Sequence, residues 1–174
     1  MDEGLLRAAR QGDESAFHAL VDRHAGRLFR LAVSLVGNEA DAEDVLQETL
    51  MGAFERMHGF EGRSTVKTWL TRILVRQAAR FHRRRGRRKE QMLAPNGFEA
   101  RVPSASQAAD RRLDVREALG RLSREHREVV VLREFDGMSY AEMADTLGVP
   151  QGTVESRLYR ARQELKGALR GYLS

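Results

Sequence analysis

The chain has 174 residues, of which 41% are hydrophobic and 32% are charged, with a formal net charge of +5. This length and apolar content suffice for one medium or two small globular domains, and the absence of cysteine excludes disulfides, thiolate metal sites and cysteine nucleophiles. No apolar run approaches the length of a membrane span and no signal-peptide pattern is visible, so we expect a cytoplasmic protein without membrane contact of its own.

Acidic and basic residues are unevenly distributed along the chain. Residues 1–60 carry 11 Asp and Glu against 6 Lys and Arg, whereas residues 61–90 carry 11 Lys and Arg against 2 acidic residues. A second basic segment, residues 149–174, carries 5 basic and 2 acidic residues. The two basic segments predict two separate contacts with a polyanion, and the acidic front predicts a different partner.

The first half has the periodicity of a helical bundle. After possible N-caps at Asp13 and Ser15, apolar residues recur at steps of three and four from Phe17 to Leu35, and the pattern stops at Gly37. This segment predicts one amphipathic helix whose apolar face is buried.

Two further helices are predicted in this half. Asn38 can cap the first of them, which ends near Gly59 and has an acidic face opposite its apolar one. A loop over residues 60–65 follows. The next helix begins at Val66, becomes rich in arginine, and is expected to fray near Gly86.

The composition changes between Lys89 and Asp110 to Pro, Asn, Gly, Ser and Ala with little periodicity, which predicts a flexible linker. Strand-like alternation is nearly absent from the chain. We therefore expect an all-α fold of two small helical domains, residues 1–88 and 113–174, joined by a flexible linker over residues 89–112.

The second half begins with a predicted helix over residues 113–120 and a second that Ser123 caps and that ends at Asp136. The sharpest local signal follows. Ser139 and Glu142 have the spacing of a capping box, in which each side chain accepts a hydrogen bond from the other residue's backbone N–H. A helix is therefore expected to start there.

That helix runs to Leu147, residues 148–150 form a turn, and Thr153 can cap a final helix that continues through Leu165 or further. This is the spacing of a helix-turn-helix, whose second helix can enter the major groove of DNA. Its buried stripe is predicted to be Val154, Leu158, Ala161 and Leu165. The DNA-facing residues are predicted to be Thr153, Glu155, Ser156, Arg157, Tyr159, Arg160 and Arg162.

The sequence contains no candidate residues for catalysis or for metal binding. The five histidines are scattered without metal-ligand spacing, and no nucleophile with a base or phosphate-binding loop is present. We expect no cofactor, no metal and no enzyme activity.

Four segments resemble the extracytoplasmic-function (ECF) sigma factors, the small members of the sigma-70 family. Residues 132–144 (LREFDGMSYAEMA) and 152–162 (GTVESRLYRAR) resemble the family's −35-recognition domain. Residues 41–49 (DAEDVLQET) resemble its polymerase-binding segment. Residues 60–64 (FEGRS) with 68–73 (TWLTRI) resemble its −10 element reader.

The resemblance implies that the chain is a specificity subunit for bacterial RNA polymerase core, which it would contact at the β′ clamp and the β flap. The promoter would be bound as duplex DNA at the −35 element and as single-stranded DNA at the −10 element, and an anti-sigma factor is expected as regulator. The implied polymerase-binding residues are Asp41, Asp44, Val45, Gln47 and Glu48. The implied −10 residues are Phe60, Arg63, Ser64, Thr65, Lys67, Arg72, Arg76, Arg80, Arg83 and Arg84.

Three positions depart from the family's usual pattern. Relatives commonly have Asn where Arg76 stands, a small acidic or polar residue where Arg80 stands, and a basic residue where Glu155 stands. A carboxylate at the last position favours cytosine over guanine. These departures predict that the chain prefers other bases than its relatives do at both the −10 and the −35 element.

Some features allow a simpler interpretation. The acidic helix face could be an ordinary solvated surface, and the arginine run near residues 83–89 could be a disordered basic tail. Trp69 continues an apolar stripe and is expected in the core. An autonomous helix-turn-helix regulator that binds DNA as a dimer is the alternative function, but it would not need the segments at residues 41–49 and 60–73.

Overall fold

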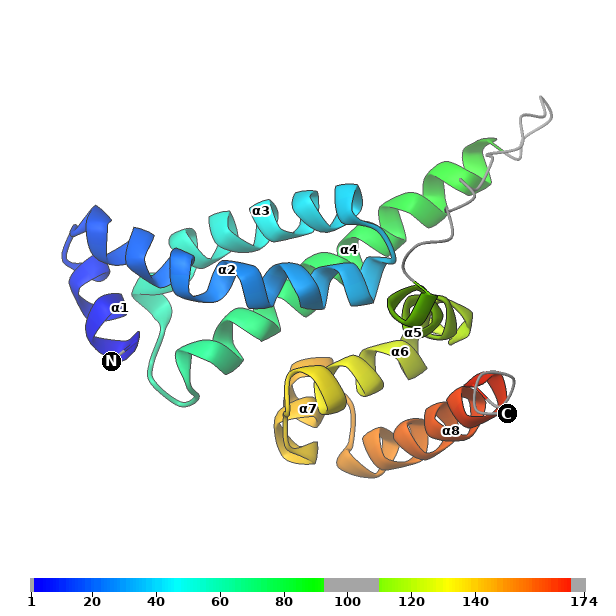
Figure 1. Cartoon of the computed structure of the whole chain (residues 1–174). Helices are drawn as coiled ribbons and strands as arrows, with labels where there is room; N and C mark the ends of the chain where they lie inside the picture. The colour runs from blue at the N-terminus through cyan, green and yellow to red at the C-terminus, as the bar shows by residue number, and fades with distance from the viewer. Residues whose placement is uncertain (1, 93–109, 170–174) are drawn as a thin grey trace.

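The computed structural model describes residues 2–92 and 110–169, and all regular structure within these ranges is helical. Figure 1 shows two groups of helices lying against each other. The first group comprises α1 (Asp2–Arg10), α2 (Glu14–Val36), α3 (Glu39–Arg56), the short 3₁₀ turn η1 (Met57–Gly59) and α4 (Val66–Met92). The second comprises α5 (Asp110–Arg121), α6 (Arg124–Val130), the π-helical turn η2 (Val131–Phe135), α7 (Tyr140–Leu147) and α8 (Gln151–Leu169). The predicted all-α fold with two small helical domains is confirmed.

The helices α2 and α3 of the first domain begin at capping side chains, and α2 ends at a glycine in the left-handed conformation. The side chain of Asp13 accepts a hydrogen bond from the N–H of Ala16 and caps α2, and Gly37 ends that helix with a φ of 98°. Asn38 caps α3 through the N–H of Asp41. These boundaries match the sequence predictions.

Two features of the first domain differ from the predictions. Helix α1 was not expected, although Leu6 and Ala9 are buried at a spacing of three residues and pack α1 against the bundle. Helix α4 continues past Gly86 to Met92, because one glycine costs only about 1 kcal/mol in a helix and the surrounding arginines are good helix formers. The predicted linker therefore starts within a helix, and residues 93–109 lie outside the described ranges.

The second domain is a helix-turn-helix built on α6. Ser139 caps α7 with the predicted capping box, and Gly148 ends α7 with a φ of 67°. The predicted cap at Thr153 is wrong: α8 already begins at Gln151, because the carbonyl of Pro150 accepts hydrogen bonds from the N–H groups of Thr153 and Val154. Thr153 therefore lies within the first turn of the helix.

Buried apolar residues of the two domains form one continuous cluster. Leu28, Leu74 and Leu132 are fully buried within it. Arg127 of α6 lies at the contact, donating hydrogen bonds to carbonyls of its own domain and, at 3.2 Å, to the carbonyl of Leu35 in α2. The domains are thus packed on each other and not merely tethered.

Candidate polymerase and nucleic-acid interfaces

Helix α3 carries the acidic surface predicted from the sequence. Asp44 and Gln47 are exposed, and Asp41 and Glu48 are partly exposed. Spacings of three and four residues place Asp41, Asp44 and Glu48 on one side of the helix. Val45 is the exception, because it is only 3% exposed and packs in the core. Val45 was predicted to contact the polymerase, but its side chain is buried and instead packs α3 against the rest of the bundle.

The acidic surface adjoins the arginine-rich half of α4. Arg84 lies 3.2 Å from a carboxylate oxygen of Glu48, and Arg85 lies 2.9 Å from one of Asp41. These pairs are exposed and contribute little to stability. Arg83–Arg85 therefore belong to an ordered helix and not to a disordered tail. Among the three carboxylates of this surface, Asp44 alone forms no ion pair with the described part of the chain.

The loop over residues 60–65 is held at both ends. We call it the base-capture loop, after the capture of an unpaired −10 base that its resemblance to the −10 element reader implies. The ring of Phe60 packs edge-on against Trp69 with centroids 5.3 Å apart, and its carbonyl accepts a hydrogen bond of 3.2 Å from Arg10 of α1. Trp69 is partly buried against the core, as predicted. A hollow of about 510 Å³ lies between α1 and this loop, and Arg10, Phe60 and Gly62 contribute to its lining.

The remaining polar residues of the loop lie on the surface or cap the next helix. Arg63 is exposed and pairs with Glu61 at 2.9 Å, and Ser64 is partly exposed. The hydroxyl of Thr65 accepts a hydrogen bond from the N–H of Thr68 at 3.1 Å and so caps α4. Thr65 therefore has a structural role in addition to its predicted place beside DNA.

The predicted −10 residues on α4 divide into two groups. Lys67 and Arg72, near the start of the helix, form ion pairs with Asp136 and Asp145 of the second domain. Arg76, Arg80, Arg83 and Arg84, further along, are exposed, and the last of them pairs with Glu48. The first three line a hollow of about 340 Å³ beside α3, so the two unusual arginines of the sequence, Arg76 and Arg80, share one basic concavity.

In the second domain, α8 buries the stripe predicted for it. Val154, Leu158 and Ala161 are at most 1% exposed, and Leu165 packs against the core. The outward face carries Tyr159, which is 67% exposed, and Arg160, which is exposed and makes no ion pair within residues 2–92 and 110–169. Both are placed to meet a ligand that approaches α8 from outside.

Several other predicted −35 residues make contacts within the domain. Arg157 pairs with Glu125 at 3.1 Å, and Arg162 pairs with Glu134 at 2.7 Å. Glu155 accepts a hydrogen bond of 3.0 Å from Gln151, which orients its carboxylate along the outer face. The hydroxyl of Ser156 donates to the carbonyl of Thr153 at 3.0 Å. DNA phosphates would compete with Glu125 and Glu134 for these arginines.

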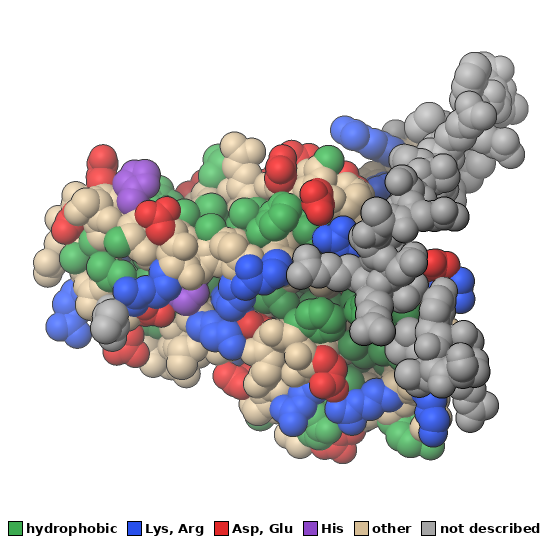
Figure 2. Space-filling view, viewed as in Figure 1, with side chains coloured by type: hydrophobic (Ala, Val, Ile, Leu, Met, Phe, Trp, Pro, Cys, Tyr) green, Lys and Arg blue, Asp and Glu red, His purple; other side chains and the backbone are tan. Residues whose placement is uncertain are grey.

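Within the described ranges no group of three or more His, Asp or Glu is placed to hold a metal ion. None of the helices in the same ranges is both long and apolar enough to cross a membrane. On the face seen in Figure 2, basic side chains gather along the junction of the two domains and over the second one.

Comparison with known proteins identifies both domains. Sigma-70 region 2 matches residues 20–88, and Sigma-70 region 4 matches residues 112–165. The RNA polymerase sigma factor NccH of Alcaligenes xylosoxydans xylosoxydans is 34% identical over 176 residues, covering 97% of this chain and 95% of NccH. The chain belongs to the ECF sigma factors.

Two further relatives support this assignment. The ECF RNA polymerase sigma factor SigE of Mycolicibacterium smegmatis is 40% identical over 167 residues, which cover 91% of this chain and 64% of SigE. The sigma factor RpoE of Bartonella quintana, solved in complex with the anti-sigma factor NepR, is 31% identical. The two structures superpose with a TM-score of 0.75, and the match covers 88% of this ECF sigma factor and 96% of RpoE.

Sequence reasoning missed two groups of residues in this ECF sigma factor. Arg10 lies in α1, ahead of the matched region 2, and was not associated with the base-capture loop. Asp136, Glu142 and Asp145 contact α4 across the domain junction. The acidic balance of residues 119–148, with 6 Asp and Glu against 4 Lys and Arg, was a signal for the second group.

Proposed function

We propose that this chain directs bacterial RNA polymerase core to promoters by binding the polymerase with region 2 and by contacting DNA with both domains. One observation carries the proposal. The same molecule combines a helix-turn-helix with an exposed basic recognition face and, on the other domain, an acidic surface on α3 that would repel DNA. A DNA-binding protein that acts alone would gain no affinity for DNA from such an acidic surface, whereas a protein that also binds the polymerase can use it as a second interface.

The acidic surface of α3 is the proposed contact with the β′ clamp. Asp44 and Gln47 are exposed there, and Asp41 and Glu48 become available if their pairs with Arg85 and Arg84 open. Exposed pairs open readily, since they contribute at most about 1 kcal/mol. The second domain is the proposed contact with the β flap.

The base-capture loop and α4 form the proposed −10 interface. An unstacked base would enter beside Phe60, and the exposed Arg76, Arg80 and Arg83 would bind the backbone of the single strand. Unstacking a base costs a few kcal/mol, which the contacts of the captured base must offset. Opening of the promoter is then driven by binding, and no catalytic group of the protein is needed.

Helix α8 is the proposed −35 interface. Tyr159 and Arg160 are exposed on its outer face, and Glu155 is held there by Gln151. A guanidinium in the major groove binds guanine, whereas a carboxylate accepts from cytosine N4. The pair Glu155 and Arg160 supports a −35 element that contains both bases.

An anti-sigma factor is the proposed regulator. The solved relative RpoE is in complex with the anti-sigma factor NepR, and this chain matches it over 88% of its length at a TM-score of 0.75. A chain built in the same way offers the same kind of surface. We place the protein in the cytoplasm, where the polymerase is.

The proposal is tested by transcription in vitro. The purified chain is combined with bacterial core polymerase and a library of promoter fragments, and transcripts are mapped. Transcripts that depend on the chain and start at defined sites are expected. Their absence from every fragment, with a control sigma factor active on the same core, would remove the proposal.

A further inference from the structure

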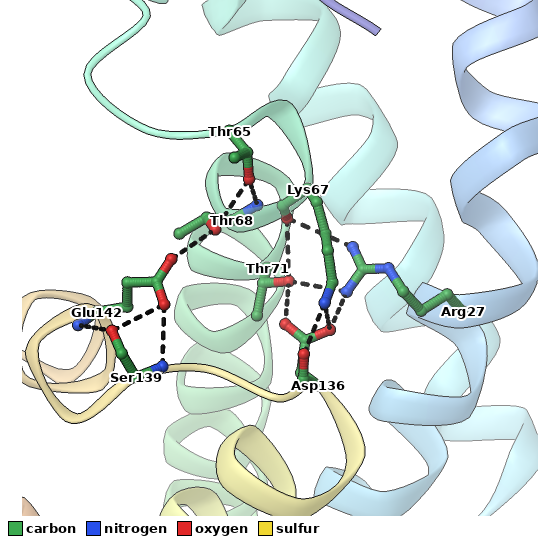
Figure 3. Close-up of polar contacts among 8 residues, drawn as sticks. All are labelled: Arg27, Thr65, Lys67, Thr68, Thr71, Asp136, Ser139 and Glu142. Atoms are coloured by element: carbon green, nitrogen blue, oxygen red, sulfur yellow. Dashed lines mark hydrogen bonds and ion pairs between the residues drawn. The ribbon is translucent and has the colours of Figure 1, made fainter. Parts of the chain in front are cut away.

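Gln77 of α4 carries a buried hydrogen-bond acceptor that has no partner. Near the start of the same helix, buried polar groups are paired, as Figure 3 shows: Thr71 donates a hydrogen bond of 2.9 Å to Asp136. Gln77 is only 8% exposed, and its Nε2 donates a hydrogen bond of 3.3 Å to the backbone carbonyl of Glu48 in α3. Its Oε1 is the one buried side-chain oxygen within residues 2–92 and 110–169 that accepts no hydrogen bond. Buried acceptors of this kind are rare, because leaving them bare costs free energy.

The hydrogen bond to Glu48 fixes the orientation of the Gln77 amide. The end beside the carbonyl of Glu48 must be the nitrogen, since two oxygens would repel each other there. The free end is therefore the oxygen. Gln77 lines the hollow of about 340 Å³ beside α3, so a donor group that enters this hollow can reach the amide.

The hollow is otherwise surrounded by cations. Four exposed arginines line it, and none of them forms an ion pair with the described residues: Arg56, Arg76, Arg80 and Arg83. Arg56 comes from the end of α3 and donates a hydrogen bond of 3.1 Å to the carbonyl of Gly52. A Cβ atom at Gly52 would lie 2.7 Å from Nη1 of Arg56, so the lack of a side chain there makes room for the guanidinium.

The chemistry of the hollow calls for a ligand that both accepts and donates hydrogen bonds. A guanidinium only donates and the oxygens of a phosphodiester only accept, so a sugar-phosphate backbone alone would satisfy the arginines and leave Oε1 of Gln77 bare. A nucleotide also brings N–H donors on its base. Adenine and cytosine combine an exocyclic amino group with a neighbouring ring acceptor, which suits an amide oxygen beside a guanidinium. Thymine has no amino group, and guanine has a second N–H in place of that acceptor.

We propose that Gln77 is a specificity-determining residue of the −10 interface, whose Oε1 accepts a hydrogen bond from the amino group of an adenine or a cytosine. Arg56 joins the arginines of α4 in binding the flanking phosphates, and this movement of the arginines uncovers Oε1. The inference rests on the proposed −10 role of α4. Gln77 follows Trp69 by roughly two helical turns, so the base that it contacts is not the one captured beside Phe60.

The first arm of the test compares base preferences of the polymerase holoenzyme. Core polymerase is assembled with the parent chain, with Gln77→Met, or with Gln163→Met, a matched control at an exposed position of α8. Met has about the length of Gln and no amide oxygen. Each complex selects from a pool of single-stranded DNA with a randomised −10 segment, and the bound strands are sequenced. Circular dichroism verifies that each variant is folded.

We expect the parent chain and the control to enrich adenine or cytosine at one position that Gln77→Met leaves random, while the preferences at all other positions stay the same. The same profile for the parent chain and for folded Gln77→Met would overturn the proposal. A lost preference for thymine or guanine would also overturn it.

The second arm removes the amino group from the DNA. In the strand that the parent chain binds best, each adenine and cytosine is replaced in turn by the analogue with hydrogen in place of the amino group. At one position the parent chain should bind several-fold more weakly, whereas Gln77→Met should bind both strands equally. If the parent chain tolerates the analogue at every position, the proposal is wrong, and this result does not depend on the folding of any variant.

Arg56→Gln separates phosphate binding from base recognition. This variant should bind every strand several-fold more weakly, by the same factor and with unchanged base preferences, because a phosphate contact is independent of sequence. A changed base preference in Arg56→Gln together with an unchanged one in Gln77→Met would contradict the assignment.

The remaining outcomes distinguish this inference from the proposed function. Gln77 also lines a second hollow, of about 260 Å³, beside Asp44 and Glu48 of the polymerase-binding surface. If Gln77→Met weakens binding to core polymerase and leaves the base preferences unchanged, the partner of Oε1 belongs to the polymerase and the inference is wrong. If the parent chain directs transcription but enriches no strand, only the inference fails. If it gives neither transcripts nor enriched strands, the proposed function fails as well.

Discussion

The guanidinium of Arg10 donates a hydrogen bond of 3.2 Å to the backbone carbonyl of Phe60, so α1 holds the first residue of the base-capture loop. The loop is otherwise fixed by the packing of Phe60 on Trp69 and by the cap that Thr65 provides for α4. Helix α1 precedes the part of the chain that matches sigma-70 region 2, yet it forms one wall of the hollow beside the loop.

Substitution Arg10→Ala should impair promoter opening without affecting assembly with the polymerase. Losing one hydrogen bond costs about 0.5–1.5 kcal/mol, which corresponds to an approximately two- to tenfold lower equilibrium constant for open-complex formation and so to a smaller fraction of open complex. Permanganate reactivity of unpaired thymines at the −10 element measures this fraction. Arg7→Ala, which changes a neighbouring residue of the same hollow, is the control. Equal effects of both substitutions would show that general charge near the loop matters and the hydrogen bond does not.

Asp44→Arg should weaken binding to core polymerase, because it places a positive charge in the middle of the acidic surface of α3. Binding of the full chain to duplex −35 DNA should stay unchanged, since α8 is in the other domain. Glu43→Arg makes the same charge change at the neighbouring exposed position, which points to a different side of the helix. Titration of labelled chain with core polymerase measures the affinity. Loss in both binding assays would contradict the assignment of this surface.

Arg160→Ala should weaken binding to the preferred −35 sequence by about 1–3 kcal/mol if the guanidinium contacts a base. Its exposed position and the absence of an ion pair within the described residues leave it available for this role. Competition binding with single-base variants of the −35 duplex gives the measurement. A loss of the same size on every sequence would instead identify Arg160 as a phosphate contact.

The contribution of Glu142 to stability should depend on pH. Hydrogen bonds from the backbone and hydroxyl of Ser139, with a smaller contribution from Thr68, hold the pKa of Glu142 below its ordinary value. A carboxyl group with a lowered pKa in the folded state stabilises the fold above its unfolded pKa, and this stabilisation is lost as the pH falls through the lowered value.

Urea unfolding between about pH 2 and pH 7 tests this expectation, with Glu142→Gln as the comparison. The parent chain should lose more stability on acidification than the variant, and the two should converge at the acidic end. Parallel curves over the whole range would show that the capping box does not depend on the charge of Glu142.

The local structure of this protein follows closely from its sequence. Asn38, the capping box of Ser139 and the stripe from Val154 to Ala161 are local signals, and each has the predicted structural consequence. Where local signals compete, the prediction failed. Thr153 has the chemistry of an N-cap, but the carbonyl of Pro150, three residues earlier, accepts hydrogen bonds from the N–H groups of Thr153 and Val154, so the helix begins at Gln151 instead.

The contacts between the domains could not be predicted in this way. Asp136 is 65 residues from Thr71 and 109 residues from Arg27, and no periodicity relates such positions. The sequence marks Asp136 only as the end of a helix. Its burial depends on α4 presenting Lys67 and Thr71 on the side that faces the second domain, which is a property of the packed molecule.

The most direct test of the account is transcription of fragmented genomic DNA of the source bacterium by core polymerase with and without the chain. Start sites that require the chain should share two sequence elements at a fixed spacing, one near −10 and one near −35, and Arg160→Ala should change only the use of the −35 element. Start sites that are the same with and without the chain would contradict the claim that it selects promoters.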